Sequence, residues 1–261
     1  MKKVKDIMSE MEKLAPTYLK EDFDNVGLML GDKNQEVKKV LVALDCTLEV
    51  IEEAKSLKVD MILTHHPLIF RKPNSITTET LLGKKIIELI KNNISLYSSH
   101  TNLDSAEEGL NKNIVDMLGF KSDELLEINK KNSNAGLGRV VRLDKEIEVM
   151  DLVDIVKEKL NIDNLRISIG NEKIRNIAII NGSGQDFINR AVEKGVNCII
   201  TGDTTYHYAS DYKEMGVSIL DIGHFSSEWL VFLKTIEKVI NNFKDVEFIT
   251  SKIVKDPYTF V

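Results

Sequence analysis

All five histidines of this 261-residue chain lie in short clusters beside strand-like runs, and three of the clusters also contain a carboxylate. The clusters are His65 with His66, His100 with Asp104, Asp203 with His207, and His224 with Glu228. Imidazole and carboxylate are the side chains that commonly bind divalent metal ions in proteins. The distribution therefore predicts one composite metal site.

The number of candidate ligands indicates what such a site would do. His65, His66, His224, Asp104 and Glu228 make five ligand residues. If Glu228 bridges two ions, each ion receives three protein bonds, which is typical of catalytic rather than structural zinc-type sites. Two dications outweigh two carboxylates in charge, so the site would acidify bound water and attract an anionic substrate such as a phosphate. These features predict a two-metal hydrolytic centre.

The remaining polar residues of the clusters are candidates for supporting roles. His100, Asp203 and His207 could orient the ligands or transfer protons during catalysis. His207 could equally be a surface histidine in a polar loop. We therefore expect these three residues beside the metal ligands rather than among them.

Simpler roles stay open for several residues. Asp104 could cap the helix that follows it, and Glu228 could favour the dipole of its own helix. His65 and His66 are adjacent, and adjacent residues on a regular strand point to opposite faces. The two rings could therefore serve two different ions, or they could be exposed turn residues.

Two further motifs are weaker candidates for chemistry. Asn181-Gly182-Ser183-Gly184 follows an expected strand, and its backbone amides could contact a phosphate, although a tight turn is the favoured interpretation. Cys46 lies at the end of an expected strand, and only this position argues for a nucleophile.

Composition and charge exclude several classes of protein. The chain has 35 basic and 41 acidic residues and a net charge of -6, which argues against nucleic-acid binding. No apolar run approaches the roughly 20 residues that span a membrane, so we expect no membrane partner. Cys46 and Cys198 lie far apart in strand-like contexts, which predicts a reducing, cytoplasmic location and a buried thiol at Cys198.

Short β-branched runs alternate with helical stretches, which predicts an α/β protein with largely parallel sheets. Strands are expected at residues 40–45, 61–64, 94–98, 138–143, 177–181, 198–201 and 218–221. Helices are expected at residues 4–14, 48–57, 80–91, 107–118, 150–159, 185–194 and 227–241. The polar stretch at residues 121–134 predicts a linker, with a domain boundary near residue 127.

The two halves of the chain repeat one pattern. In each half a strand leads through a helix to a second strand, and Asp45 precedes His65 by 20 positions as Asn181 precedes Gly202 by 21. A third strand in each half then ends in a histidine with an acid four residues later. The repeat predicts a duplicated α/β module whose strand ends converge at an interdomain cleft.

Five motifs extend these observations along the chain. They are Phe23-Asp24-Asn25-Val26-Gly27-Leu28, Thr64-His65-His66-Pro67-Leu68-Ile69-Phe70, His100-Thr101-Asn102-Leu103-Asp104, Thr201-Gly202-Asp203 with His207, and Gly223-His224 with Glu228. Together and in this order, from about residue 4 to the C-terminus, they resemble the GTP cyclohydrolase 1 type 2 homolog family, also called Nif-three-like proteins. The chain resembles the short form, without the inserted middle domain of some bacterial members.

The resemblance implies a fold, an assembly and a ligand set. It implies two similar α/β domains with mixed, largely parallel sheets, a first domain at 1–126 completed by the segment 224–261, and a second domain at 127–223. It implies a ring-shaped homohexamer with the metal sites facing an internal cavity. The family's ligands match His65, His66, Asp104, His224 and Glu228, with the glutamate bridging two divalent ions, for which zinc, iron and manganese are all suitable.

Two hypotheses for the function follow. The first is a metal-dependent hydrolase that acts on a nucleotide or another phosphate-bearing small molecule, with His100 or His207 transferring protons. The second is a non-catalytic assembly that binds or delivers metal or that interacts with other proteins.

Overall fold

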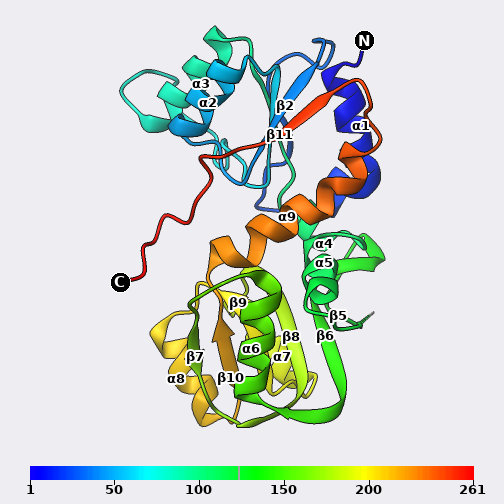
Figure 1. Ribbon diagram of the computed structural model, residues 1–261, viewed down its shortest axis with the longest axis vertical. Coiled ribbons are helices and arrows are strands. Elements are labelled where there is room, and N and C mark those ends of the chain that lie inside the picture. Colours follow the sequence, from blue (N-terminus) through cyan, green and yellow to red (C-terminus); the bar gives the residue numbers. More distant parts are fainter. Residues whose placement is uncertain (123) are drawn as a thin grey trace. The chain divides into compact units, whose positions relative to one another are not determined.

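The computed structural model describes residues 1–122 and 124–261 and has an α/β fold with two mixed β-sheets (Figure 1). The chain divides into two compact units. The first comprises Met1–Leu103 and Ile236–Lys255, and the second comprises Asp104–Thr235 and Asp256–Val261. The expected boundary near residue 127 falls inside the second unit, and the limits of independently folding domains stay a prediction.

The sheet of the first unit has the strand order β1-β4-β3-β2-β11. The strands are β1 (Gly27–Leu30), β2 (Lys39–Ala43), β3 (Met61–Thr64), β4 (Ser95–Ser98) and β11 (Glu247–Thr250). β11, β2, β3 and β4 pair in parallel, and β1 pairs with β4 in the antiparallel direction. All residues of β3 and β4 are buried, as is usual for parallel strands with both faces covered.

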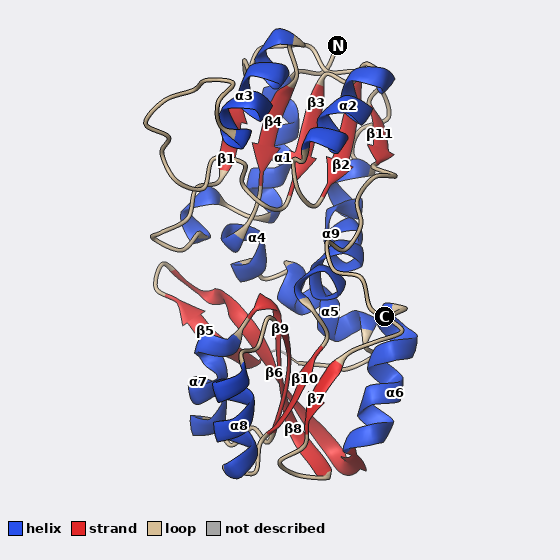
Figure 2. Ribbon diagram, turned by 90° about the vertical axis from the view of Figure 1, so that its left-hand side faces the viewer, coloured by secondary structure: helices blue, strands red, loops and turns tan. Residues whose placement is uncertain are grey.

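Helices cover both faces of this sheet. α2 (Leu48–Leu57) and α3 (Leu81–Lys91) lie on one face, and α1 (Val4–Leu14) lies on the other (Figure 2). Thr47 and Thr80 are the N-cap residues of α2 and α3, and each threonine side chain accepts a backbone hydrogen bond from the first turn of its helix. The 3₁₀ turn at Thr17–Leu19 and the end of α9 (His224–Ile240) complete the described part of the unit.

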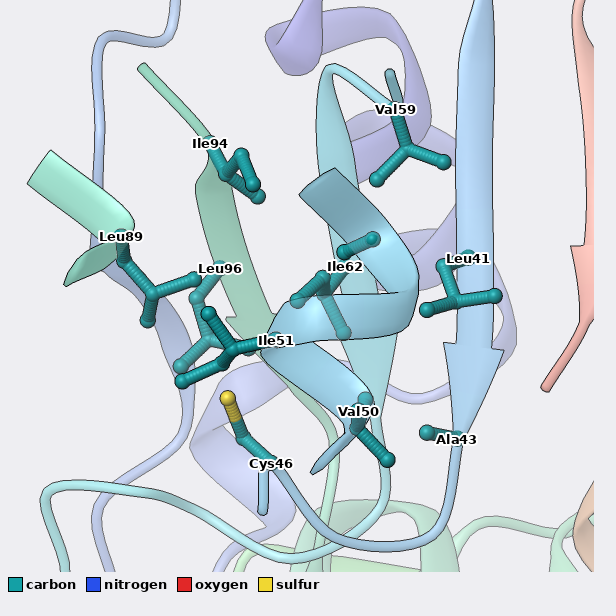
Figure 3. Packing of buried hydrophobic residues seen from close by; sticks show 11 residues of the cluster. Leu41, Ala43, Cys46, Val50, Ile51, Val59, Ile62, Leu89, Ile94 and Leu96 are labelled. Carbon is teal, nitrogen blue, oxygen red and sulfur yellow. The ribbon is translucent and has the colours of Figure 1, made fainter. Parts of the chain in front are cut away.

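A buried apolar cluster joins α2 and α3 to the sheet (Figure 3). Leu41, Ile62 and Leu96 come from three neighbouring strands, and Ile51 and Leu89 come from the two helices. Ile62 is fully buried and lies on the central strand β3, beneath α2. The cluster therefore fixes the strands whose ends carry the histidines.

Ile62→Val is expected to lower the free energy of unfolding by about 0.5–1.5 kcal/mol, because it removes one buried methylene and leaves a small cavity. Denaturant unfolding measures this loss. Ile90→Val on the exposed side of α3 is the matched control, since Ile90 is 62% exposed. Equal losses in the two variants would contradict the placement of Ile62 in the core.

The sheet of the second unit has the strand order β5-β6-β8-β9-β10-β7. The strands are β5 (Glu124–Asn129), β6 (Asn132–Glu148), β7 (Arg166–Ser168), β8 (Lys173–Ser183), β9 (Cys198–Gly202) and β10 (Ser218–Asp221). β8, β9 and β10 are parallel, whereas β5, β6 and β7 pair in the antiparallel direction. In both units an antiparallel edge strand therefore pairs with the outermost strand of the parallel set, β1 with β4 and β7 with β10.

Helices also cover both faces of the second sheet. α7 (Ile188–Glu193) and α8 (Tyr206–Glu214) lie on one face, and α6 (Val149–Leu160) lies on the other (Figure 2). Alternate residues of β8 divide between the two faces, and Ala178 and Ile180 pack in the cluster that includes Ile188 of α7. α4 (Thr101–Ser105) and α5 (Leu110–Met117) follow the first sheet along the chain.

One sequence expectation is wrong. Residues 121–134 are not a linker, because β5 and the start of β6 form an antiparallel pair within them; residue 123 lies outside the described residues. The stretch is polar because one face of an edge pair contacts solvent, while Leu126 on the other face is buried. The helices α4 and α8 and the strands β1, β5, β7 and β11 were not expected either.

Parallel pairing brings the candidate ligands to one edge of each sheet. In the first unit Ala43 pairs with Thr64 and Thr64 pairs with Ser98, so β2, β3 and β4 end at the same level. In the second unit Thr201 pairs with Asp221, so β9 and β10 also end together. The residues that follow these strands are therefore neighbours within each unit, although they are distant in sequence.

Candidate metal centre

Three histidines gather at the carboxyl edge of the first sheet. His65 and His66 follow β3 and His100 follows β4. The ring centroids are 5.1 Å apart for His65 and His66 and 5.2 Å apart for His65 and His100, and one nitrogen from each of the three rings lies within 4.8 Å of the others. His65 and His66 lie beyond the end of the regular strand, so the alternation that would separate their rings does not apply.

Each of these rings has its Nδ1 atom hydrogen-bonded to an oxygen. His65 Nδ1 lies 2.8 Å from the carbonyl oxygen of Ser99, and His66 Nδ1 lies 2.9 Å from Asp45 Oδ1. A carbonyl oxygen cannot donate, so Nδ1 of His65 carries the proton and the neutral ring has a lone pair on Nε2. This tautomer is the one that binds a metal through Nε2 while the other nitrogen is fixed by an oxygen.

His100 is held by a buried carboxylate. Its Nδ1 lies 2.9 Å from Asp24 Oδ1, and Asp24 also accepts a hydrogen bond from the backbone nitrogen of Thr101 at 3.1 Å. Burial opposes ionisation of Asp24, but the hydrogen bonds from His100 and Thr101 outweigh it and lower the pKa of Asp24 to about 2. Asp24 was not among the expected site residues, although it lies in the first family-like motif.

The second unit carries an imidazole and a carboxylate on one helix. His224 is the first residue of α9, and its Nε2 lies 3.1 Å from Glu228 Oε2. His224 Nδ1 lies 2.7 Å from Asp203 Oδ2. His224 and Glu228 are four positions apart in α9 and therefore lie on one face of this helix. Asp203 therefore fixes the orientation of the His224 ring, and its role beside a metal ion stays a prediction.

Asp104 lies within the second unit beside Asn181. Its Oδ1 accepts a hydrogen bond of 2.8 Å from Asn181 Nδ2, and the same nitrogen lies 3.5 Å from Glu228 Oε1. Asp104 lies inside α4 and the N-cap of α5 is Gly109, so helix capping does not explain Asp104. Asn181 thus joins the two candidate acidic ligands of this unit, a role that no sequence pattern indicated.

The end of β8 is shaped around Glu228. Gly182 has a φ of +61°, and a Cβ atom there would lie 2.3 Å from Glu228 Oε1. The Gly182 nitrogen donates to Ser227 Oγ at 2.8 Å, and the Gly184 nitrogen donates to Thr201 Oγ1 at 2.9 Å. Both backbone amides are therefore engaged by side chains, which favours the tight-turn interpretation over phosphate binding.

Two other candidates lie elsewhere. His207 is exposed in the first turn of α8, where its ring meets the ring of Tyr206 at 5.4 Å between centroids. The role of His207 in proton transfer stays a prediction. Cys46 packs in the apolar cluster under α2, and burial raises its pKa to about 12, which argues against a nucleophile.

A cavity lies beside His224 within the second unit. Its volume is about 400 Å³, and its lining includes His224, Asp203, Arg166 and residues 256–260 near the C-terminus. Arg166 contacts Asp221 and donates to the carbonyl oxygen of Thr204 at 3.0 Å. The cavity is large enough for a small molecule next to a candidate ligand.

The fold and these groups define a two-unit α/β protein with imidazole and carboxylate side chains at the carboxyl ends of its parallel strands. A family model described as Duf34/NIF3 (NGG1p interacting factor 3) matches residues 2–257. The chain belongs to this family, which confirms the resemblance.

Similar proteins agree with this assignment over the whole chain. A Clostridium perfringens protein named GTP cyclohydrolase 1 type 2 homolog is 56% identical, over 99% of this chain and 100% of its own length. A Listeria monocytogenes protein of the same name is 26% identical in an alignment of 371 residues that covers 96% of each chain. This alignment is longer than the 261 residues of the present chain, as expected if this chain is the short form of the family. The crystal structure of Staphylococcus aureus protein SA1388 has a TM-score of 0.89 at 30% identity, covering 100% of this chain and 99% of that one.

None of the described helices has the length and apolar content to cross a membrane.

Proposed function

We propose that this protein holds two divalent metal ions and hydrolyses a phosphate-bearing small molecule. His65, His66, Asp104, His224 and Glu228 would hold the ions, with Glu228 shared between them. The observation that carries the proposal is the orientation of the rings. His65, His66 and His224 each direct Nδ1 to an oxygen, which leaves Nε2 as the coordinating atom.

The donor set suits such ions in chemistry as well as in number. Imidazole nitrogen and carboxylate oxygen are ligands for zinc, iron and manganese alike. When bound, two such ions would lower the pKa of water and attract an anion. The separation of 3.1 Å between His224 Nε2 and Glu228 Oε2 also suits two ligands of one ion.

The chain's other polar residues would support this reaction. Asp203 and Asp45 fix the rings of His224 and His66 through their Nδ1 atoms. His100, fixed by Asp24, is the candidate for proton transfer, and His207 is a second candidate. The cavity beside His224 would hold the substrate, and a nucleotide is the class suggested by the name of the Clostridium perfringens relative.

The first test is metal analysis of protein purified without chelators, followed by turnover assays with the metal found. We expect two equivalents per chain in the wild type and at most one in Glu228→Gln, with loss of turnover on a panel of nucleotides, phosphodiesters and cyclic amidines. Glu237→Gln, at an exposed position of the same helix, is the matched control. Full metal occupancy without turnover on any substrate would contradict the hydrolase.

A second candidate function is a metal-holding assembly that acts through protein partners, which the family description as an interacting factor favours. It predicts that the wild type has no hydrolase activity and that His65→Ala changes the binding of protein partners. A homohexamer with its metal sites facing an internal cavity is compatible with either function, and sedimentation analysis tests it. The free cysteines Cys46 and Cys198 support a reducing, cytoplasmic location.

A further inference from the structure

Asn181, near the end of β8, contacts both candidate acidic ligands of the second unit. Its Nδ2 lies 2.8 Å from Asp104 Oδ1 and 3.5 Å from Glu228 Oε1. An ionised carboxylate only accepts hydrogen bonds, so the amide nitrogen rather than the amide oxygen must face the two acids. We infer that Asn181 is a positioning residue that holds Asp104 and Glu228 in the geometry that binds a divalent cation. This inference rests on the metal site of the proposed function.

Burial makes this contact important. Asn181 is 7% exposed, Asp104 8% and Glu228 2%. Water therefore screens the two carboxylates poorly, and like charges repel more strongly where the effective dielectric constant is low. A neutral group with two hydrogens can donate to both acids and add no charge. Asn181 thus keeps the two acids close together in the protein before a cation binds.

The duplicated pattern of the chain supports the same role. Asp45 follows β2 in the first unit at the position that corresponds to Asn181 in the second. Asp45 accepts from a ring nitrogen, that of His66 at 2.9 Å, whereas Asn181 donates to carboxylates. Each residue therefore has the hydrogen-bonding role that its partners require: an acid faces a donor, and an amide faces acceptors.

The other end of the amide argues against a purely structural asparagine. Asn181 Oδ1 is buried and has no hydrogen-bond partner among the described residues. Buried polar atoms nearly always have a partner, and a structural asparagine is expected to use both ends of its amide. The Asn181 side chain is thus arranged for the acids on one side and can accept a hydrogen bond from a bound molecule on the other.

The test compares Zn²⁺ binding and thermal unfolding of the full chain with two variants. Asn181→Leu removes the donors at similar volume, and we expect the Zn²⁺ Kd to weaken 10–100-fold, the range for groups that orient metal ligands. Asn181→Asp keeps the shape but adds a third carboxylate. We expect the metal-free Asn181→Asp protein to melt below the wild type, and Zn²⁺ to raise its Tm by more than it raises that of the wild type.

Asn197→Leu is the matched control. Asn197 is half-buried and bonds the backbone of residues 173, 175 and 176 at the amino end of the same sheet, so its loss should lower the Tm and leave the Zn²⁺ Kd unchanged. If Asn181→Leu and Asn181→Asp behave like this control while the wild type binds Zn²⁺, the inference is wrong and the proposed metal site stands. If the wild type fails to bind Zn²⁺ or another divalent ion, both are wrong.

Discussion

Gly182→Ala is expected to lower the free energy of unfolding by about 2–5 kcal/mol and to abolish tight binding of divalent metal. Two effects add. The backbone at Gly182 has a φ of +61°, which is strained for any residue with a Cβ atom, and that atom would lie 2.3 Å from Glu228 Oε1. Glu228 is 2% exposed, so its carboxylate has little room to move aside. Denaturant unfolding and Zn²⁺ titration measure the two losses.

Gly216→Ala separates the two effects. Gly216 has a φ of +78°, and nothing lies within 4 Å of the Cβ atom that alanine would add. We expect this control to lose only the strain of about 1–2 kcal/mol and to keep its metal affinity. If Gly182→Ala and Gly216→Ala give the same loss of stability and the same metal affinity, the close approach of Gly182 to Glu228 does not contribute to metal binding.

Asp24→Asn is expected to lower the free energy of unfolding at pH 7 by about 3 kcal/mol, the lower end of the cost of removing one partner from a buried ion pair. The side chain of Asp24 is fully buried and faces His100 Nδ1 and the Thr101 nitrogen. An amide group would turn a donor toward at least one of these donors. The lower end applies because the side chain of His100 is 19% exposed, so water can solvate the ring when its partner is removed. Asp22→Asn, at an exposed neighbouring position, should change stability by less than about 0.5 kcal/mol.

The pH dependence of this loss has a definite sign. The pKa of Asp24 is about 2 in the folded protein, below its ordinary value of 3.8, so its ionised form stabilises the fold. This stabilisation is complete above about pH 4 and is lost as the pH falls toward 2. The difference in the free energy of unfolding between the wild type and Asp24→Asn should therefore become smaller as the pH falls from 4 to 2. A difference that stays constant over this range would show that Asp24 acts through packing alone.

Residue types and local spacing were sufficient to predict much of this molecule. Hydrophobic periodicity predicted β3, β10, α1 and α2 at their observed bounds, because local burial on a sheet or helix face dictates the pattern. The helix was expected to begin at residue 227 and it begins at His224, so the spacing alone did not predict that His224 and Glu228 share a helical face. The assignment of the metal ligands rests on the types of their donor atoms and on the family motifs, and this assignment stays a prediction.

The supporting contacts could not be predicted because they join distant parts of the chain. His100 and Asp24 are 76 positions apart, and Asn181 and Asp104 are 77 positions apart. No periodicity in a single sequence links such positions, and asparagine and aspartate are common in turns for unrelated reasons. The edge strands β1, β5, β7 and β11 were missed for a different reason: they are short or partly exposed, so their hydrophobic pattern is weak.

The burial of both cysteines has a practical consequence for spectroscopy. Cys46 and Cys198 are 4% and 0% exposed, and burial raises the pKa of both thiols, so thiol-reactive dyes and spin labels should leave them unmodified. A cysteine introduced at an exposed position, such as Ile90 in the first unit or Met150 in the second, would then be the reactive one. Paired labels at these two positions would report the separation of the units in solution, with and without metal, in a protein that keeps its native cysteines.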